Sequence, residues 1–185
     1  MVADTVESLG CLDIMVANAG IVGGGTLDTL PVETFDKVIA VNLRGTMMCY
    51  KYAGQEMVKQ GRGGRIIGAS SVVGKKGSGG LTAYSATKFA IRGLTQSFAM
   101  EMLSHRVTVN AYCPGLIITE MTASPSDVHF GGRHGAAVRQ SLGVPPEIPD
   151  GKPEDIASWV SYICKPEAHY ITGSSSLIAS GAVMD

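Results

Sequence analysis

The sequence lacks the features that mark several classes of protein. No apolar run reaches the roughly 18 residues that a membrane-spanning helix needs. Neither sign of charge is in excess, because 15 basic and 16 acidic residues give a formal net charge of −1. This balance supplies no basic field for nucleic acid. The N-terminus, MVADTVESLG, has no apolar core and differs from a signal peptide. We therefore expect a cytoplasmic protein that binds neither membranes nor nucleic acid.

Cysteine and histidine are sparse and show no metal-binding pattern. The cysteines are Cys11, Cys49, Cys113 and Cys164, and no pair has CxxC spacing. We interpret them as buried or free thiols in a reducing compartment. The four histidines have no spacing typical of metal ligands either, and we predict no metal site.

The residues that are present predict one α/β domain. Hydrophobic residues make up 45% of the 185 residues and charged residues 17%, which excludes a disordered chain. Short apolar runs that suit buried strands alternate with longer helical patterns. This alternation predicts parallel strands joined by right-handed crossovers. The predicted strands cover residues 12–17, 64–70, 106–112 and 175–179, and the main helices cover about 32–59, 83–103 and 153–164.

Tyr84 and Lys88 are the candidate reactive pair. Their i, i+4 spacing places both side chains on one face of the helix predicted over residues 83–103. An ammonium group beside a phenol favours the phenolate, so we expect a lowered tyrosine pKa and a role as general acid or base. Ser71 precedes the pair at the predicted end of a strand, where its hydroxyl could donate to a carbonyl oxygen. The alternative is a half-buried aromatic residue beside a solvated lysine.

Two further segments combine small or polar residues with a predicted element. Asn18, Ala19 and Gly20 follow the first strand, where small residues allow a ligand to approach the backbone. A plain turn is the alternative. Asn42 lies inside the first long helix, which is locally unfavourable because its amide competes with the backbone for hydrogen bonds. It could simply face solvent.

Several motifs in order over essentially the whole chain resemble the short-chain dehydrogenase/reductase family. They are GRIIGASSVVG, AYSATKFAIRGLTQSFAMEM and VTVNAYCPGLIITEM, together with NAG and PGLIIT. The resemblance implies a Rossmann-like doubly wound parallel sheet and an NAD cofactor, with NADP as the alternative. The catalytic residues that it implies are Asn42, Ser71, Tyr84 and Lys88. The cofactor-binding residues that it implies are Asn18, Ala19, Gly20, Tyr84, Lys88, Pro114, Gly115, Ile117 and Thr119.

The resemblance also assigns roles. Tyr84 gives a proton to the developing alkoxide, and Ser71 stabilises that oxygen. Lys88 lowers the tyrosine pKa and binds the nicotinamide ribose. Asn42, at a disturbed point of its helix, holds a water that links Lys88 to solvent. Residues 120–150 correspond to the substrate lid.

Within the family, YSATKFAIRGLTQ, VTVNAYCPG and VSYICKPEAHYITG resemble acetoin/diacetyl reductases. This implies interconversion of a carbonyl and a secondary alcohol in a small diketone or hydroxyketone, such as diacetyl or acetoin. A relative acting on 3-oxoacyl thioesters or on other secondary alcohols is the alternative.

The dinucleotide fingerprint of the family, TGxxxGxG after a first strand, does not occur. We therefore expect residues 1–185 to be one partial domain that lacks the first strands, with an unpaired apolar edge at residues 12–17. A non-catalytic assembly module is the alternative, and so is a fragment that does not fold. The family pairs subunits through the helices at about 32–59 and 83–103, which implies a homo-oligomer.

Overall fold

The computed structural model describes residues 1–26 and 28–184. At its centre, parallel strands lie side by side in the order β1-β2-β3-β4. Their bounds are Ile14–Ala17 for β1, Gly64–Ala69 for β2, Val107–Pro114 for β3 and Ser175–Ile178 for β4. The parallel α/β arrangement predicted from the alternation of apolar runs is confirmed.

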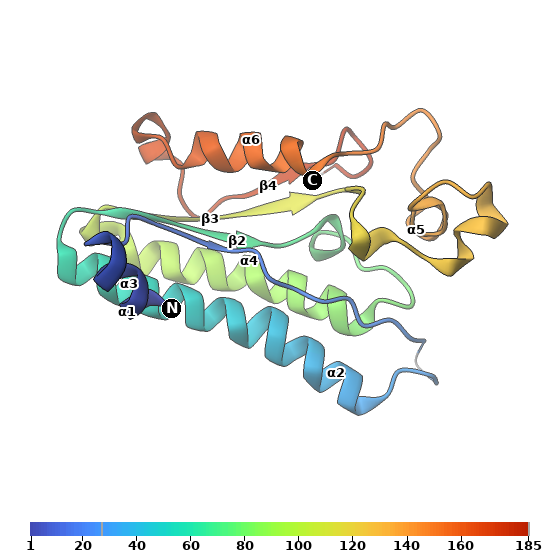
Figure 1. Ribbon diagram of the computed structural model, residues 1–185, viewed down its shortest axis with the longest axis horizontal. Coiled ribbons are helices and arrows are strands. Elements are labelled where there is room, and N and C mark those ends of the chain that lie inside the picture. Colours follow the sequence, from blue (N-terminus) through green and yellow to red (C-terminus); the bar gives the residue numbers. More distant parts are fainter. Residues whose placement is uncertain (27, 185) are drawn as a thin grey trace.

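Helices cover both faces of this sheet (Figure 1). On one face lie α1 (Val2–Leu9), α3 (Gly45–Gln60) and α4 (Thr82–Met102), and on the other lies α6 (Pro153–Ile163). The segment between β3 and α6 extends beyond the carboxyl ends of the strands and contains α5 (Ala136–Ser141). Short 3-10 turns occupy Val72–Gly74, Leu103–His105, Glu120–Thr122, Pro125–Phe130 and Pro166–Tyr170.

The predicted first long helix consists of three pieces. It begins with α2 (Val32–Val38), continues as a π-helical segment (Ile39–Arg44) and ends as α3. The disturbance that the resemblance implied at Asn42 is thus confirmed, because Asn42 lies inside the π-helical segment. Such segments are frequent at functional sites.

The core is divided by the sheet. Side chains alternate between the two faces of a strand, so Ile66 of β2 packs toward Tyr50 and Met57 of α3. Ile67 packs on the opposite face with Tyr112 and residues of α6. Burying such side chains removes apolar surface from water, which supplies the main favourable free energy of folding.

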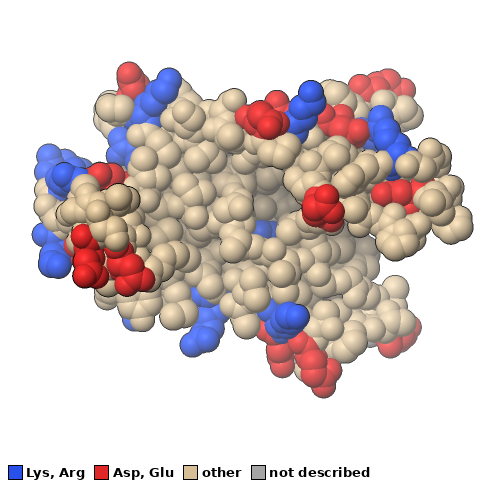
Figure 2. All heavy atoms as spheres, in the orientation of Figure 1, with Lys and Arg blue, Asp and Glu red and all other residues tan. Residues whose placement is uncertain are grey.

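Among the described residues, β1 is an edge strand. Its Met15 and Ala17 are buried against the α3 face, whereas Ile14 and Val16 remain 43% and 39% exposed. In Figure 2 most of the middle of the displayed face is free of charged side chains, which gather around its rim. An unpaired apolar edge, as the sequence predicted, is confirmed for the part of the chain that the structure describes.

Two side-chain amides form hydrogen bonds with backbone groups that lie outside the strands. Gln60 Oε1 accepts a hydrogen bond from Leu12 N at 2.8 Å, and its Nε2 donates to Leu12 O at 2.8 Å. Asn110 joins the loop before β4 in a similar way, donating to Ile171 O and accepting from Ser174 N. These bonds satisfy backbone groups that would otherwise lose hydrogen bonds on burial.

Gly68 leaves the space that Tyr50 fills. A Cβ atom at position 68 would lie 2.1 Å from the Tyr50 hydroxyl oxygen, which is hydrogen-bonded to Thr95 Oγ1. We expect Gly68→Ala to lower the free energy of unfolding by about 1–3 kcal/mol, measured by urea denaturation. In a Tyr50→Phe background the same change should cost less, because the clashing oxygen is gone. Gly77→Ala is the control, since a Cβ atom there meets nothing within 4 Å. An equal loss in both backgrounds would contradict this account of the packing.

Candidate active site

A cavity of about 650 Å³ opens at the carboxyl ends of the strands. It lies between the segments that follow β1, β2 and β3, the first turns of α4 and the segment that contains α5. Every site residue predicted from the sequence lines it except Asn42. Those lining residues are Asn18, Ala19, Gly20, Ser71, Tyr84, Lys88, Pro114, Gly115, Ile117 and Thr119.

Ser71 directly follows β2, and its extended backbone starts the 3-10 turn Val72–Gly74. Its Oγ accepts a hydrogen bond from Val73 N at 3.2 Å, which orients the hydroxyl at the cavity wall. The preceding Ser70 donates to Lys88 O at 2.8 Å and so fastens α4 to the end of β2. Ser70 was not among the site residues predicted from the sequence, although it is adjacent to Ser71 in GASSVVG.

Tyr84 and Lys88 lie on one face of α4, as their spacing predicted. Lys88 Nζ is 5.2 Å from the centre of the Tyr84 ring and donates to Ala69 O at 2.7 Å. Burial lowers the pKa of the Lys88 ammonium to about 8, although the nearby Cys113 acts in the opposite direction. Lys88 is only 3% exposed, so its charge is costly to keep out of water.

The prediction of a lowered tyrosine pKa is wrong. Burial raises the pKa of the Tyr84 phenol, and the hydrogen bond with Ser71 opposes that shift only in part. The spacing argument considered the attraction between an ammonium and a phenolate but not the loss of water around both groups. Desolvation penalises the charged form of each partner, which makes the tyrosine less acidic and the lysine less basic.

Asn42 lies fully buried behind the cavity wall, which excludes the interpretation that it faces solvent. Its Oδ1 accepts from Ile21 N at 2.8 Å, and its Nδ2 donates to Ile21 O at 2.9 Å and to Thr87 Oγ1 at 3.3 Å. A Cβ atom at Gly20 would lie 3.3 Å from Asn42 Oδ1 and 3.5 Å from Lys88 Nζ. Gly20 therefore brings the backbone close to both side chains.

Tyr112 is a second residue that sequence reasoning missed. It belongs to β3 and lines the cavity, and its hydroxyl donates to Asn18 Oδ1 at 2.6 Å. Burial raises the pKa of Tyr112 to about 12, so the phenol stays protonated and remains a donor. The bond fixes Asn18 across the intervening strand. Its place as the last residue of the predicted strand, two positions before Pro114, was the available sequence signal.

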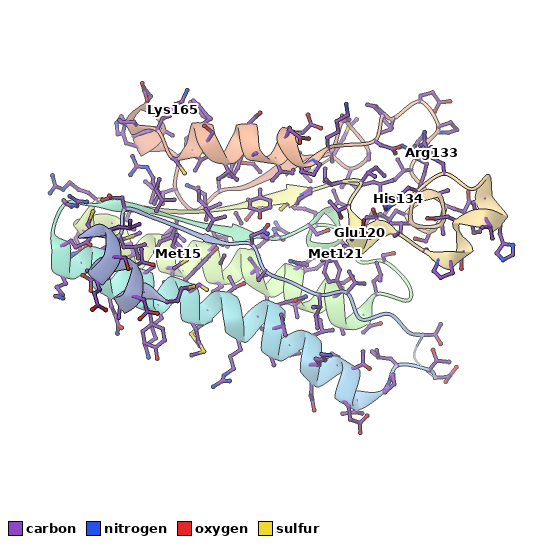
Figure 3. The ribbon with its side chains drawn as sticks, in the orientation of Figure 1. Met15, Glu120, Met121, Arg133, His134 and Lys165 are labelled. Atoms are coloured by element: carbon purple, nitrogen blue, oxygen red, sulfur yellow. The ribbon has the colours of Figure 1, made fainter. Side chains whose placement is uncertain are left out.

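Thr119 connects the cavity with the segment containing α5. Its carbonyl oxygen lies 2.9 Å from His134 Nε2, which donates when that nitrogen carries the proton. Figure 3 shows Glu120, Met121, Arg133 and His134 gathered on this side of the molecule, with Lys165 at the other end. The sequence placed Thr119 at the site but gave no sign of His134 beside it.

Residues 1–26 and 28–184 contain no group of three or more His, Cys, Asp or Glu side chains placed to hold a metal ion. All four cysteines are free. Across the same residues, no helix is both long and apolar enough to cross a membrane.

The fold and the residues around this cavity are those of a dehydrogenase family. The sequence model described as short chain dehydrogenase matches residues 1–128, so the chain belongs to the short-chain dehydrogenase family. The Rossmann-like doubly wound sheet that the resemblance implied is confirmed by solved structures of the same fold.

Curated relatives match the whole chain. A short-chain dehydrogenase/reductase of Armillaria gallica is 44% identical over 191 aligned residues, which cover 100% of this chain and 70% of that protein. The 3-oxoacyl-[acyl-carrier-protein] reductase FabG of Staphylococcus aureus is 38% identical over 184 residues, covering 100% of this chain and 71% of that protein.

Two solved structures that are similar to this chain are named for the substrate acetoin. Acetoin dehydrogenase YohF from Salmonella typhimurium superposes with a TM-score of 0.81 at 33% identity, over 97% of this chain and 68% of that one. Acetoin dehydrogenase from Enterobacter cloacae superposes with a TM-score of 0.82 at 31% identity, over 98% and 68%.

Proposed function

We propose that this cavity interconverts a carbonyl compound and a secondary alcohol with NAD, or alternatively NADP, as hydride carrier. One observation carries the proposal: Ser71, Tyr84 and Lys88 reach the same cavity from the end of β2 and from one face of α4. When bound, the nicotinamide supplies or accepts the hydride. The chain's own residues position the substrate and transfer the proton.

Tyr84 is the proposed proton donor in reduction. Because burial raises its pKa, the phenol is protonated at neutral pH, as a general acid requires. The Ser71 hydroxyl, hydrogen-bonded to Tyr84, donates to the same substrate oxygen as negative charge develops there. Lys88, with a pKa of about 8, is mostly protonated at neutral pH and stabilises the phenolate that the transfer leaves behind.

Asn42 supports the proposed proton relay through the backbone. Its amide is committed to Ile21 and Thr87, so it holds the Gly20 region beside Lys88 rather than reaching into the cavity. We propose that a water in this region links Lys88 to solvent. The relay then restores the proton that Tyr84 gives away.

The nicotinamide end of the cofactor fits the walls formed by two segments. The first is Asn18, Ala19 and Gly20, where Gly20 leaves the backbone open to close approach. The second runs from Pro114 through Gly115 and Ile117 to Thr119. Lys88 projects between them and offers donors to ribose hydroxyls.

The proposed substrate is a small vicinal diketone or hydroxyketone, such as diacetyl or acetoin. The two acetoin dehydrogenase structures support this choice. A 3-oxoacyl thioester is the alternative, which the likeness to FabG supports. In either case we propose residues 120–150 as the substrate lid of a single domain.

A cytoplasmic location also remains a prediction. The four free cysteines support it, because thiols stay reduced in that compartment.

Titration of NADH into the purified chain, followed by nicotinamide fluorescence, tests the proposal. We expect saturable binding in the micromolar range, and NADH-dependent reduction of diacetyl in the same preparation. A folded chain that binds no NADH and reduces no diacetyl would contradict the proposed function. A chain that reduces 3-oxoacyl thioesters instead would keep the mechanism and change the substrate.

Assembly is a second candidate function, because α3 and α4 expose apolar side chains. Tyr52, Phe89 and Met100 are 47%, 42% and 75% exposed. We propose that a homo-oligomer forms through residues of about 32–59 and 83–103. Sedimentation velocity tests it: association without any NADH binding would favour an assembly module over an enzyme.

A further inference from the structure

The segment between β3 and α6 forms one wall of the cavity although it contains little regular structure. It contributes Met121 and Thr122 from a 3-10 turn, and Val138, Ser141 and Leu142 from α5 and its end. A six-residue helix is not stable by its own hydrogen bonds. Other contacts must therefore hold α5 in place.

Asp127 is the first of these contacts. Its side chain is only 8% exposed and accepts three backbone N–H bonds, from Ser124 at 3.2 Å, Gly135 at 3.0 Å and Ala137 at 2.8 Å. The bond from Ala137 is the main reason that the pKa of Asp127 is lowered. One carboxylate thus closes the loop before α5 and caps the first turn of this helix.

Asp150 closes the loop after α5. Arg139 of α5 donates to Asp150 Oδ1 at 2.5 Å and to the carbonyl oxygens of Pro145 and Ile148, both at 2.7 Å. Arg133 approaches the other oxygen of Asp150 at 2.8 Å. Arg133 precedes α5, and Arg139 lies in the last turn of α5. Both arginines pair with the same carboxylate, which is only 20% exposed.

Among the residues that the structure describes, Lys88 is the only charged residue that lines the cavity. Over the same residues, the lid side of the cavity wall contributes no cation. Both lid arginines are engaged with Asp150, and the exposed Glu120 lies next to the lining residue Met121. The remaining walls are largely apolar: Leu81, Leu116, Met121, Val138, Leu142 and Ile156. A carboxylate far from the reacting carbonyl would lose its water without meeting an opposite charge.

We propose that Asp127 and Asp150 are positioning residues that hold α5 as a pre-formed apolar wall and keep both lid arginines away from the substrate. The site therefore selects an uncharged carbonyl compound with an apolar group over its carboxylate analogue. This inference rests on the proposed function only for the placement of the carbonyl at Tyr84. It makes the lid, rather than the catalytic residues, the source of selectivity.

The test compares binding of p-methylacetophenone and p-acetylbenzoate, which differ at the end away from the carbonyl. Affinities come from saturation-transfer NMR on the full chain, without cofactor and without turnover. We expect the uncharged ketone to bind at least roughly tenfold more tightly, because the carboxylate must be desolvated unpaired. Equal affinities, or no binding of the ketone, would overturn the inference.

Asp150→Asn is the diagnostic variant, because it removes the charge that the two arginines share. We expect the preference for the ketone to fall roughly fivefold or more, mainly through tighter binding of p-acetylbenzoate to a freed arginine. Asp13→Asn is the matched control, since Asp13 pairs with Arg62 at 2.5 Å near the amino end of β1. A purely structural role would weaken both ligands alike, and an unchanged preference in a folded variant would refute the proposal.

Asp127→Asn tests the other carboxylate. An amide places a donor where the carboxylate accepts, so we expect hydrogen exchange at residues 136–142 to accelerate and ketone affinity to fall several-fold. Protection elsewhere should stay unchanged, which separates a loosened lid from an unfolded chain. Unaltered exchange at α5 would contradict the role of Asp127. Turnover of diacetyl with NADH, assayed separately on the parent chain, reports a failure of the proposed chemistry independently of these affinities.

Discussion

Replacing Tyr84 with phenylalanine should reduce the turnover of diacetyl by roughly 100-fold to 10,000-fold, the range typical of a lost general acid. The phenol is the only hydroxyl in the cavity that shares a hydrogen bond with Ser71 and a helix face with Lys88 among the residues described. Phenylalanine keeps the ring and its packing but has no proton to give. Oxidation of NADH, followed by its absorbance, measures the loss.

Binding of NADH supplies the control for this experiment. We expect the affinity for NADH to change by less than about threefold, because the ring that packs beside Lys88 is retained. Tyr52→Phe, at an exposed site on α3, should change neither quantity. If Tyr84→Phe keeps most of its turnover, Tyr84 is not the proton donor and the proposed mechanism fails.

Replacing Lys88 with methionine should abolish the same reaction but stabilise the fold. The pKa of Lys88 falls from 10.5 to about 8 on burial, which corresponds to a cost of about 3 kcal/mol for keeping it charged. Methionine fills similar space without that cost but loses the hydrogen bond to Ala69 O, worth about 1–2 kcal/mol. We expect a net gain of about 1–2 kcal/mol at pH 7 by urea denaturation.

The gain in the free energy of unfolding of Lys88→Met should decrease as the pH rises above about 8. Below pH 8 the lysine is charged in both the folded and the unfolded chain, so its full cost applies. Between about pH 8 and 10.5 the unfolded chain binds more protons than the folded one, and the stability of the parent rises with pH. The advantage of Lys88→Met should therefore disappear near pH 10.5.

Lys51→Met, at an exposed position of α3, is the control for this series and should change the stability at pH 7 by less than about 0.5 kcal/mol. A variant that is destabilised at pH 7 would mean that the hydrogen bond outweighs desolvation. Together with lost turnover, increased stability would identify Lys88 as a residue that the fold keeps at a cost for the sake of chemistry.

The sequence was most informative where one periodicity or motif decides the outcome. The apolar runs predicted the four parallel strands, and the spacing of Tyr84 and Lys88 predicted their shared face. The resemblance located ten residues that line one cavity and the disturbed helix at Asn42. These features depend on local periodicity or on short sequence motifs.

The parts that failed depend on burial and on contacts distant in sequence. The direction of the Tyr84 pKa follows from desolvation, which spacing alone does not reveal. Tyr112 and Asn18 are hydrogen-bonded although they are 94 positions apart. The lid was predicted only as mixed structure, because its order does not come from helical periodicity. It comes from Asp127, which accepts hydrogen bonds from backbone N–H groups, and from Asp150, which pairs with two arginines.

The side-chain amides of Gln60, Asn42 and Asn110 also bear on how the protein ages. Each donates to a backbone carbonyl and accepts from a backbone N–H, so each uses both halves of its amide. Deamidation would replace the donor with a carboxylate oxygen facing a carbonyl oxygen, and would add a charge. Asn42 and Asn110 are fully buried, so spontaneous hydrolysis at either position would damage the folded chain far more than the same event at its surface.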